Sequence, residues 1–169
     1  MGRQIALNTA KYDFQVYVTD SNAEVCEQAR AWADEYLAGR VSKGRMTQEE
    51  ADAVAARFHV TDSLEEAARN ADLVIEAIFE NEDAKHDIFK KLNAIAPKHA
   101  ILTTNSSTMV SSIFKDDVDD PTRVANLHYF NPALVMKLVE VIRGEHTSDE
   151  TFKAVWDLSE AIGKVPVEV

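Results

Sequence analysis

The chain has 169 residues, of which 46% are hydrophobic, and its formal net charge at pH 7 is −11. This composition suits one domain with a real core, and so acidic a surface argues against general nucleic-acid binding, which needs clustered Lys and Arg. The apolar stretches are too short to cross a bilayer, so we expect no membrane contacts. Cys26 is the only cysteine, which excludes an intrachain disulfide and favours a reducing compartment. We therefore expect a cytoplasmic protein.

The start of the chain predicts a helix, a strand and a long helix. Apolar residues at helical spacing predict the first helix over 3–11, and β-branched and aromatic residues predict a strand over 14–20. Ser21 or Asn22 can cap the next helix, which we expect to end at Gly39.

Shorter elements follow. Thr47 and Ser63 each begin a capping-box sequence, which predicts the start of a helix, and a short strand is expected over 58–61 between them. The apolar runs 73–77 and 100–104 are nearly continuous, as in strands that are buried on both faces.

The remaining elements complete an alternating pattern. We expect helices over 81–96 and 148–162, and strands over 123–129, 137–143 and 165–169. Strands that alternate with helices predict an α/β fold, doubly wound, with a mostly parallel sheet and helices on both faces. Ligands in such folds bind at the carboxyl ends of the strands, so candidate functional residues are sought there.

Two residues near the first expected strand suggest a dinucleotide. Asp20 closes that strand, where a carboxylate can bind the adenosine ribose hydroxyls and repel a 2′-phosphate, although a turn or helix-capping aspartate explains it equally well. Gly2 directly precedes the first helix, where a dinucleotide-binding fold has the last glycine of its phosphate loop, but one glycine is also an ordinary chain start.

Polar side chains also follow the two buried strands. Glu80 and Lys85 lie near the end of the expected strand over 73–77. There they can contact a cofactor, or they can form the exposed first turn of a capped helix. Asn105 and Ser107 belong to a run of four small polar residues after the second, which can bind a ligand or form a capping turn.

His128 and Glu140 form the most specific candidate pair. His128 lies near the end of an apolar strand, and Glu140 lies in the middle of the next, where a carboxylate is unfavourable without a partner. A turn between the strands can bring Glu140 back to His128, fix its tautomer and leave the other ring nitrogen to take a proton. The alternative is a core histidine and an edge-strand glutamate that faces water.

Several blocks of this sequence resemble the signature of the 3-hydroxyacyl-CoA dehydrogenase family. They are residues 72–77 with 80–81, 104–107, and 127–132 followed by 135–142. The similarity covers essentially the whole chain, and the block from His128 to Glu140 is highly specific. It implies a Rossmann-type NAD-binding domain and a reaction in which L-3-hydroxyacyl-CoA is oxidised to 3-oxoacyl-CoA while a hydride passes to NAD.

The resemblance also implies a role for each candidate residue. His128 would take the hydroxyl proton, Glu140 would orient His128 and stabilise its charge, and Ser107 would hydrogen-bond the reacting oxygen. Cofactor contacts would come from Gly2, Asp20, Glu80, Lys85 and Asn105, and substrate contacts from Ser107, Lys43 and Asn131. Lys43 belongs to a basic stretch that would help to bind CoA, although a solvated basic loop is an equally good explanation. No metal is implied, because the histidinium and hydrogen-bond donors can polarise the carbonyl.

Parts of the family pattern are missing from the sequence. The opening strand, which in the family lies in the middle of the sheet beside the strand at 14–20, and the first two glycines of the phosphate loop would lie upstream of Met1. In the family a helical domain follows, supplies a catalytic asparagine and makes most of a homodimer interface. We therefore expect residues 1–169 to be an incomplete NAD-binding domain that is inactive and poorly folded by itself.

Two other functions remain open at this point. Related proteins of the same fold oxidise sugar acids such as L-gulonate, so the substrate can differ from an acyl-CoA. A non-catalytic dinucleotide-fold binding module is the second alternative, but it has no need for a base and an orienting carboxylate such as His128 and Glu140.

Overall fold

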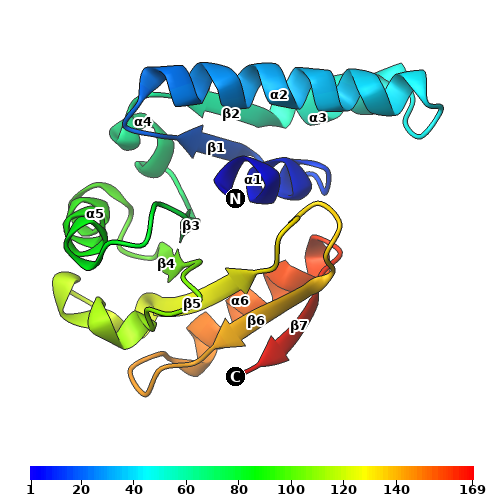
Figure 1. Cartoon of the computed structure of the whole chain (residues 1–169). Helices are drawn as coiled ribbons and strands as arrows, with labels where there is room; N and C mark the ends of the chain where they lie inside the picture. Colours follow the sequence, from blue (N-terminus) through cyan, green and yellow to red (C-terminus); the bar gives the residue numbers. More distant parts are fainter.

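The computed structural model describes residues 1–169 as an α/β fold, as the sequence predicts (Figure 1). The α-helices are α1 (Gly2–Ala10), α2 (Ala23–Ser42), α3 (Gln48–Arg57), α4 (Leu64–Ala68), α5 (Glu82–Ile95) and α6 (Asp149–Ala161). The strands are β1 (Val16–Thr19), β2 (Phe58–Thr61), β3 (Leu73–Glu76), β4 (Ile101–Thr104), β5 (Val124–Tyr129), β6 (Leu138–Ile142) and β7 (Val165–Glu168). Three short 3-10 helices, Ser111–Ile113, Lys115–Asp117 and Pro121–Arg123, connect β4 to β5.

The strands form two sheets. A parallel pair has the order β1-β2, and a five-stranded sheet has the order β3-β4-β5-β6-β7. All pairings are parallel except that of β5 with β6, which is antiparallel. The mostly parallel arrangement is confirmed, but the strands do not form one continuous sheet, because neither β1 nor β2 pairs with β3.

Helix α1 joins the two sheets through side chains on different sides of the helix. Ile5 packs into the apolar cluster around α6 and the large sheet, whereas Leu7 and Ala10 pack into the cluster around α2 and α3. Asn8, which is buried, donates a hydrogen bond from Nδ2 to the carbonyl oxygen of Ile162 at 3.1 Å. The first helix therefore fixes the position of the β1-β2 pair relative to the rest of the fold.

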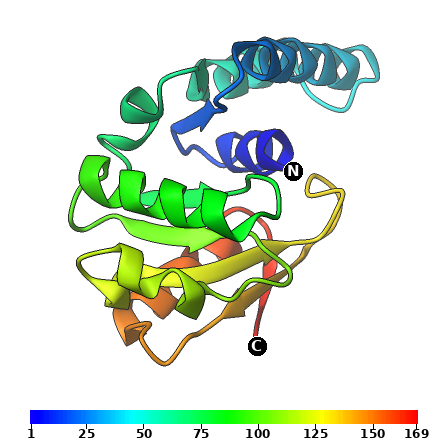
Figure 2. The same cartoon turned by 60° about the vertical axis from the view of Figure 1, so that its left-hand side comes forward.

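The five-stranded sheet has an apolar core on each face. On one face, Phe89 of α5 packs with Leu102 and Val124 of the sheet. On the other face, Val155 of α6 packs with Leu127. Figure 2 shows α5 in front of the sheet and α6 behind it, so the expected helices on both faces are confirmed.

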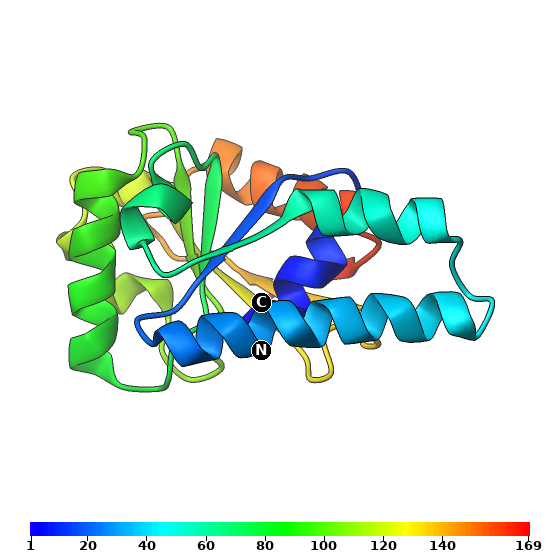
Figure 3. The same ribbon diagram turned by 90° about the horizontal axis from the view of Figure 1, so that it is seen from above.

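Helices α2 and α3 lie side by side as a hairpin that extends beyond the rest of the molecule (Figure 3). The expectation that α2 ends at Gly39 is wrong, because the helix continues to Ser42. Gly39 keeps a helical conformation, and the chain turns at Gly44, whose φ is +64°. A glycine marks a helix end where the backbone must become left-handed, and that position is Gly44.

The predicted helix starts are confirmed by side-chain caps. Thr47 forms a full capping box with Glu50, and the side chain of Ser63 accepts a hydrogen bond from a backbone N–H in the first turn of α4. Asn22 and Asn81 cap α2 and α5 in the same way. None of the helices combines the length and the apolar character needed to span a bilayer.

Candidate active site

A pocket of about 410 Å³ lies beyond the carboxyl ends of β3, β4 and β5, which is where a ligand is expected in this type of sheet. Its size is within the range of small-molecule sites. It is lined by Met1, Ala77, Ile78, Phe79, Glu80, Asn105, Ser107, His128, Tyr129, Phe130 and Asn131. Five residues proposed from the sequence thus meet around one pocket, although three different strand ends carry them.

The histidine and the glutamate are paired across two strands. His128 of β5 lies directly opposite Glu140 of β6 in the antiparallel register, so both side chains leave the same face of the sheet. Nδ1 of His128 lies 2.8 Å from Oε2 of Glu140, and the side chains are 16% and 30% exposed. The predicted pairing is confirmed. An Nδ1–H that donates to the carboxylate leaves Nε2 without a partner in the chain, as a proton acceptor needs.

Two aromatic residues that the sequence analysis does not single out also line the pocket. The ring centroid of Phe130 lies 4.9 Å from that of His128, with the planes tilted by 52°. Phe79 is 73% exposed, which is unusual for a large apolar side chain. The only sequence signal for them is their position directly after β3 and β5.

Asn105 connects the end of β4 to both of its neighbours. Its backbone N–H donates to the carbonyl oxygen of Glu76 at 2.8 Å, and its Oδ1 accepts a hydrogen bond from the backbone N–H of Tyr129, also at 2.8 Å. Its amide nitrogen, Nδ2, makes no hydrogen bond within the chain. Ser107 is exposed, and its hydroxyl has no partner in the chain either. Both groups can therefore donate to a ligand in the pocket.

Glu80 and Lys85 are placed differently from one another. Glu80 lines the pocket and accepts a hydrogen bond from the hydroxyl of Ser106 at 2.8 Å. Lys85 is almost fully buried, and its Nζ lies 2.7 and 2.9 Å from the two carboxylate oxygens of Glu76. The structure therefore does not bring the amine of Lys85 to the pocket, although the sequence groups it with the cofactor contacts.

The remaining predicted residues lie outside the pocket. Asp20 follows β1, and its Oδ1 accepts a hydrogen bond from the backbone N–H of Asn22 at 2.9 Å, as in the turn interpretation, while Oδ2 makes no hydrogen bond within the chain. Gly2 begins α1 next to Met1, at the pocket rim. Lys43 follows α2, in the connection between the two helices of the hairpin, and does not line the pocket.

Tyr129 shows how the strand separates its two faces. Its side chain packs into the core on the α6 side, whereas that of His128 borders the pocket. Burial raises the pKa of the Tyr129 phenol well above its ordinary value, and the hydroxyl has no hydrogen-bond partner. The phenol therefore stays neutral and packs as an apolar group, on the side of the strand away from the pocket.

The sequence matches the family described as "3-hydroxyacyl-CoA dehydrogenase, NAD binding domain" over residues 1–169. The chain belongs to this family. It is 43% identical to a probable 3-hydroxybutyryl-CoA dehydrogenase of Bacillus subtilis over the whole chain, and 39% identical to a 3-hydroxyadipyl-CoA dehydrogenase of Escherichia coli over 99% of it. The chain spans 58% of the length of the first relative and 35% of the length of the second.

Solved structures agree with the family assignment. A crystal structure of 3-hydroxybutyryl-CoA dehydrogenase from Escherichia coli superimposes with a TM-score of 0.95 and 36% identity, over 99% of this chain and 35% of that one. A crystal structure of (S)-3-hydroxybutyryl-CoA dehydrogenase from Ralstonia eutropha gives a TM-score of 0.94 and 32% identity, over 100% of this chain and 59% of that one. The fold of the chain is therefore that of the NAD-binding part of these enzymes.

Proposed function

We propose that the protein containing this chain is an NAD-dependent oxidoreductase that converts L-3-hydroxyacyl-CoA into 3-oxoacyl-CoA. The observation that carries this proposal is that His128, paired with Glu140, lines a pocket in an NAD-binding domain. Relatives over the whole chain are named for oxidation of hydroxyacyl-CoA thioesters, which supports the same substrate class.

The polar groups around the sheet edge fit NAD. At the pocket, the free Nδ2 of Asn105 and the carboxylate of Glu80 suit a carboxamide and ribose hydroxyls. At the end of β1, the Oδ2 of Asp20 remains free to accept hydrogen bonds from a second ribose. When it is bound, NAD supplies the acceptor for the hydride that leaves C3 of the substrate.

The proton step is assigned to His128. Glu140 holds the imidazole through Nδ1, so Nε2 is available to take the proton of the 3-hydroxyl group as C3 becomes a carbonyl carbon. The imidazolium that forms lies 2.8 Å from a carboxylate, which stabilises the new positive charge. In the reverse direction the imidazolium returns the proton to the carbonyl oxygen.

Ser107 completes the polar contacts of the reacting oxygen. Its hydroxyl has no partner in the chain, so it can donate to the oxygen without first breaking a bond. A preorganised donor of this kind stabilises negative charge that develops on an oxygen during reaction. Asn131, which also lines the pocket, is positioned to contact the same substrate.

We also propose how the protein recognises CoA and assembles. Exposed Lys43, in a protein of net charge −11, offers a local positive charge for a phosphate group of CoA. We propose a homodimer, formed through a helical domain of the kind that the family carries besides its NAD-binding domain. We propose a cytoplasmic location, supported by the free thiol of Cys26 as the sole cysteine.

The substrate class can be tested by direct competition between the proposals. The protein produced from the gene together with its flanking coding sequence should oxidise NADH in the presence of acetoacetyl-CoA. It should not reduce NAD with L-gulonate. Turnover of the sugar acid without turnover of the thioester would replace the proposed substrate. NADH binding without turnover of either compound would favour a binding module.

A further inference from the structure

A buried ion pair lies behind the wall of the pocket. Lys85, in the first turn of α5, donates from Nζ to both carboxylate oxygens of Glu76, the last residue of β3, and each side chain is only 1% exposed. Withdrawing two charges from water is unfavourable unless the geometry is good and the remaining hydrogen-bonding capacity is used. The other contacts of this pair therefore show what it holds in place.

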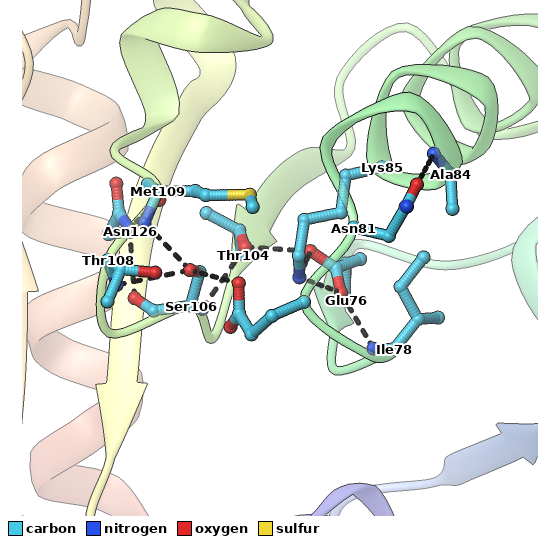
Figure 4. Close-up of polar contacts among 11 residues, drawn as sticks. Glu76, Ile78, Asn81, Ala84, Lys85, Thr104, Ser106, Thr108, Met109 and Asn126 are labelled. Atoms are coloured by element: carbon cyan, nitrogen blue, oxygen red, sulfur yellow. Dashed lines mark hydrogen bonds and ion pairs between the residues drawn. The ribbon is translucent and has the colours of Figure 1, made fainter.

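The carboxylate of Glu76 also binds the segments on either side of it. Its Oε1 accepts a hydrogen bond from the backbone N–H of Ile78 at 2.7 Å, and its Oε2 accepts one from the hydroxyl of Thr104 at 2.7 Å (Figure 4). Ile78 belongs to the pocket wall after β3, and Thr104 is the last residue of β4. One carboxylate thus fixes two strand ends and α5.

The contacts continue from Thr104 to the pocket itself. Its Oγ1 accepts a hydrogen bond from the backbone N–H of Ser106 at 3.2 Å. The hydroxyl of Ser106 donates to the carboxylate of Glu80 at 2.8 Å and accepts a bond from the backbone N–H of Met109 at 2.8 Å (Figure 4). The chain of bonds therefore runs from a buried amine to a carboxylate that lines the pocket.

We propose that Lys85 is a positioning residue that acts through Glu76 and Thr104 to hold Glu80 and residues 105–107 in place for the cofactor. Its amine is buried and both of its hydrogen bonds within the chain go to Glu76, so its effect on the pocket walls passes through that carboxylate. The inference that these walls receive NAD rests on the proposed function, whereas the ordering of residues 105–107 does not.

The strand β4 offers a matched pair of variants. Thr104→Val removes the hydroxyl between Glu76 and Ser106, whereas Thr103→Val removes an equally buried hydroxyl whose bond, at 3.0 Å, goes to the carbonyl oxygen of Val74. Each variant should lower Tm by about 2–4 °C, because each loses one buried hydrogen bond. Only Thr104→Val should weaken NADH binding, by about tenfold, with KM for NADH rising more than kcat falls. Thr104→Ser should restore binding.

The ion pair itself is tested with its charges removed singly and together. Lys85→Met leaves a buried carboxylate without its cation, so its loss of stability alone decides nothing. The double variant Glu76→Gln with Lys85→Met leaves no net buried charge. It should recover much of the Tm lost in Lys85→Met while NADH binding stays weakened, since the contacts to Ile78 and Thr104 are no longer held by a carboxylate.

Amide hydrogen exchange without cofactor gives a readout that needs neither turnover nor NADH. The amide of Ser106 should exchange faster in Thr104→Val, because this variant loses the hydroxyl that accepts the hydrogen bond of that amide. In Thr103→Val the exchange rate of the same amide should not change. Equal exchange in both variants would overturn the proposal, as would normal NADH affinity in the double variant. Faster exchange in a protein that does not turn over acetoacetyl-CoA would leave the positioning role intact and refute only the proposed reaction.

Discussion

Replacing Glu140 with glutamine removes the negative charge beside His128 while it keeps the length and shape of the side chain. In the structure Oε2 of Glu140 lies 2.8 Å from Nδ1 of His128. A glutamine oxygen at the same place can still accept the Nδ1–H bond, but it no longer balances the charge of the imidazolium. The variant therefore separates the electrostatic contribution of the carboxylate from its contribution to orientation.

The expected loss follows from the strength of the bond. A hydrogen bond to a charged group contributes about 1.5–3 kcal/mol and a neutral one about 0.5–1.5 kcal/mol, so the difference is about 1–1.5 kcal/mol. Because Glu140 is 30% exposed, solvent screening keeps the effect at the lower end. The lower end, about 1 kcal/mol, corresponds to about fivefold in rate, so kcat should fall about fivefold. If the amide instead donates to Nδ1, the proton moves to Nε2, the base is lost and the fall is larger.

The assay is NADH oxidation with acetoacetyl-CoA, followed by absorbance, together with NADH binding and Tm. We expect kcat to fall while NADH affinity and Tm stay close to those of the wild type, because glutamine keeps the shape of the side chain and does not line the pocket. A Glu140→Gln enzyme with wild-type kcat would show that the carboxylate does not stabilise a charged His128, and the proposed proton step would fail.

Three further predictions concern substrate contacts and stability. Ser107→Ala should lower kcat about tenfold, the effect of one lost donor, with little change in Tm because the side chain is exposed. Lys43→Ala should raise KM for acetoacetyl-CoA at low salt while Lys91→Ala, an exposed control on α5, does not, and equal KM values would remove Lys43 from the CoA site. Burial lowers the pKa of His146 below its ordinary 6.5, so the folded state takes up this proton less readily than the unfolded chain. Stability should therefore fall as pH decreases through 6.5 and below, and His146→Gln should flatten this dependence in urea unfolding, whereas an unchanged slope would assign it to other groups.

The pairing of His128 with Glu140 could be predicted from the sequence because its geometry is local. His128 and Glu140 lie on consecutive strands that are joined by a short connection, and an antiparallel pair places opposite residues on one face. A carboxylate in the middle of an apolar strand needs a partner, and the adjacent strand offered a histidine at the matching position. The pattern therefore offered the pairing as one of two alternatives, and the family resemblance decided between them.

Helix α2 shows where a local rule misleads. Glycine ends many helices, but Gly39 has no close neighbour on its side, and the helix continues along the face that packs against α3. A glycine inside a helix costs about 1 kcal/mol, which tertiary packing can offset. Gly44, with its positive φ, is the position that needs glycine.

Lys85 and Thr104 show what the sequence cannot provide. Its place near the end of a buried strand and the family resemblance group the lysine with the cofactor contacts. Its burial against Glu76 depends on how α5 lies beside the end of β3. The sequence predicts Thr104 as a strand end, which is confirmed, and Ser106 as part of a capping turn, which is wrong, because its hydroxyl binds the backbone N–H groups of Thr108 and Met109 and caps no helix. Their joint role becomes visible only when the hydrogen bonds between separate segments are known.

The central claim is that His128 takes the proton of the 3-hydroxyl group as L-3-hydroxyacyl-CoA is oxidised to 3-oxoacyl-CoA. Its most direct test measures NADH oxidation with acetoacetyl-CoA for the wild-type protein and the His128→Ala variant. Both are produced from the gene together with its flanking coding sequence, and the 169-residue chain is assayed in parallel. We predict that the variant binds NADH as the wild type does and loses at least about a hundredfold in kcat, as expected for a general acid and base. A His128→Ala enzyme with wild-type turnover would contradict the account.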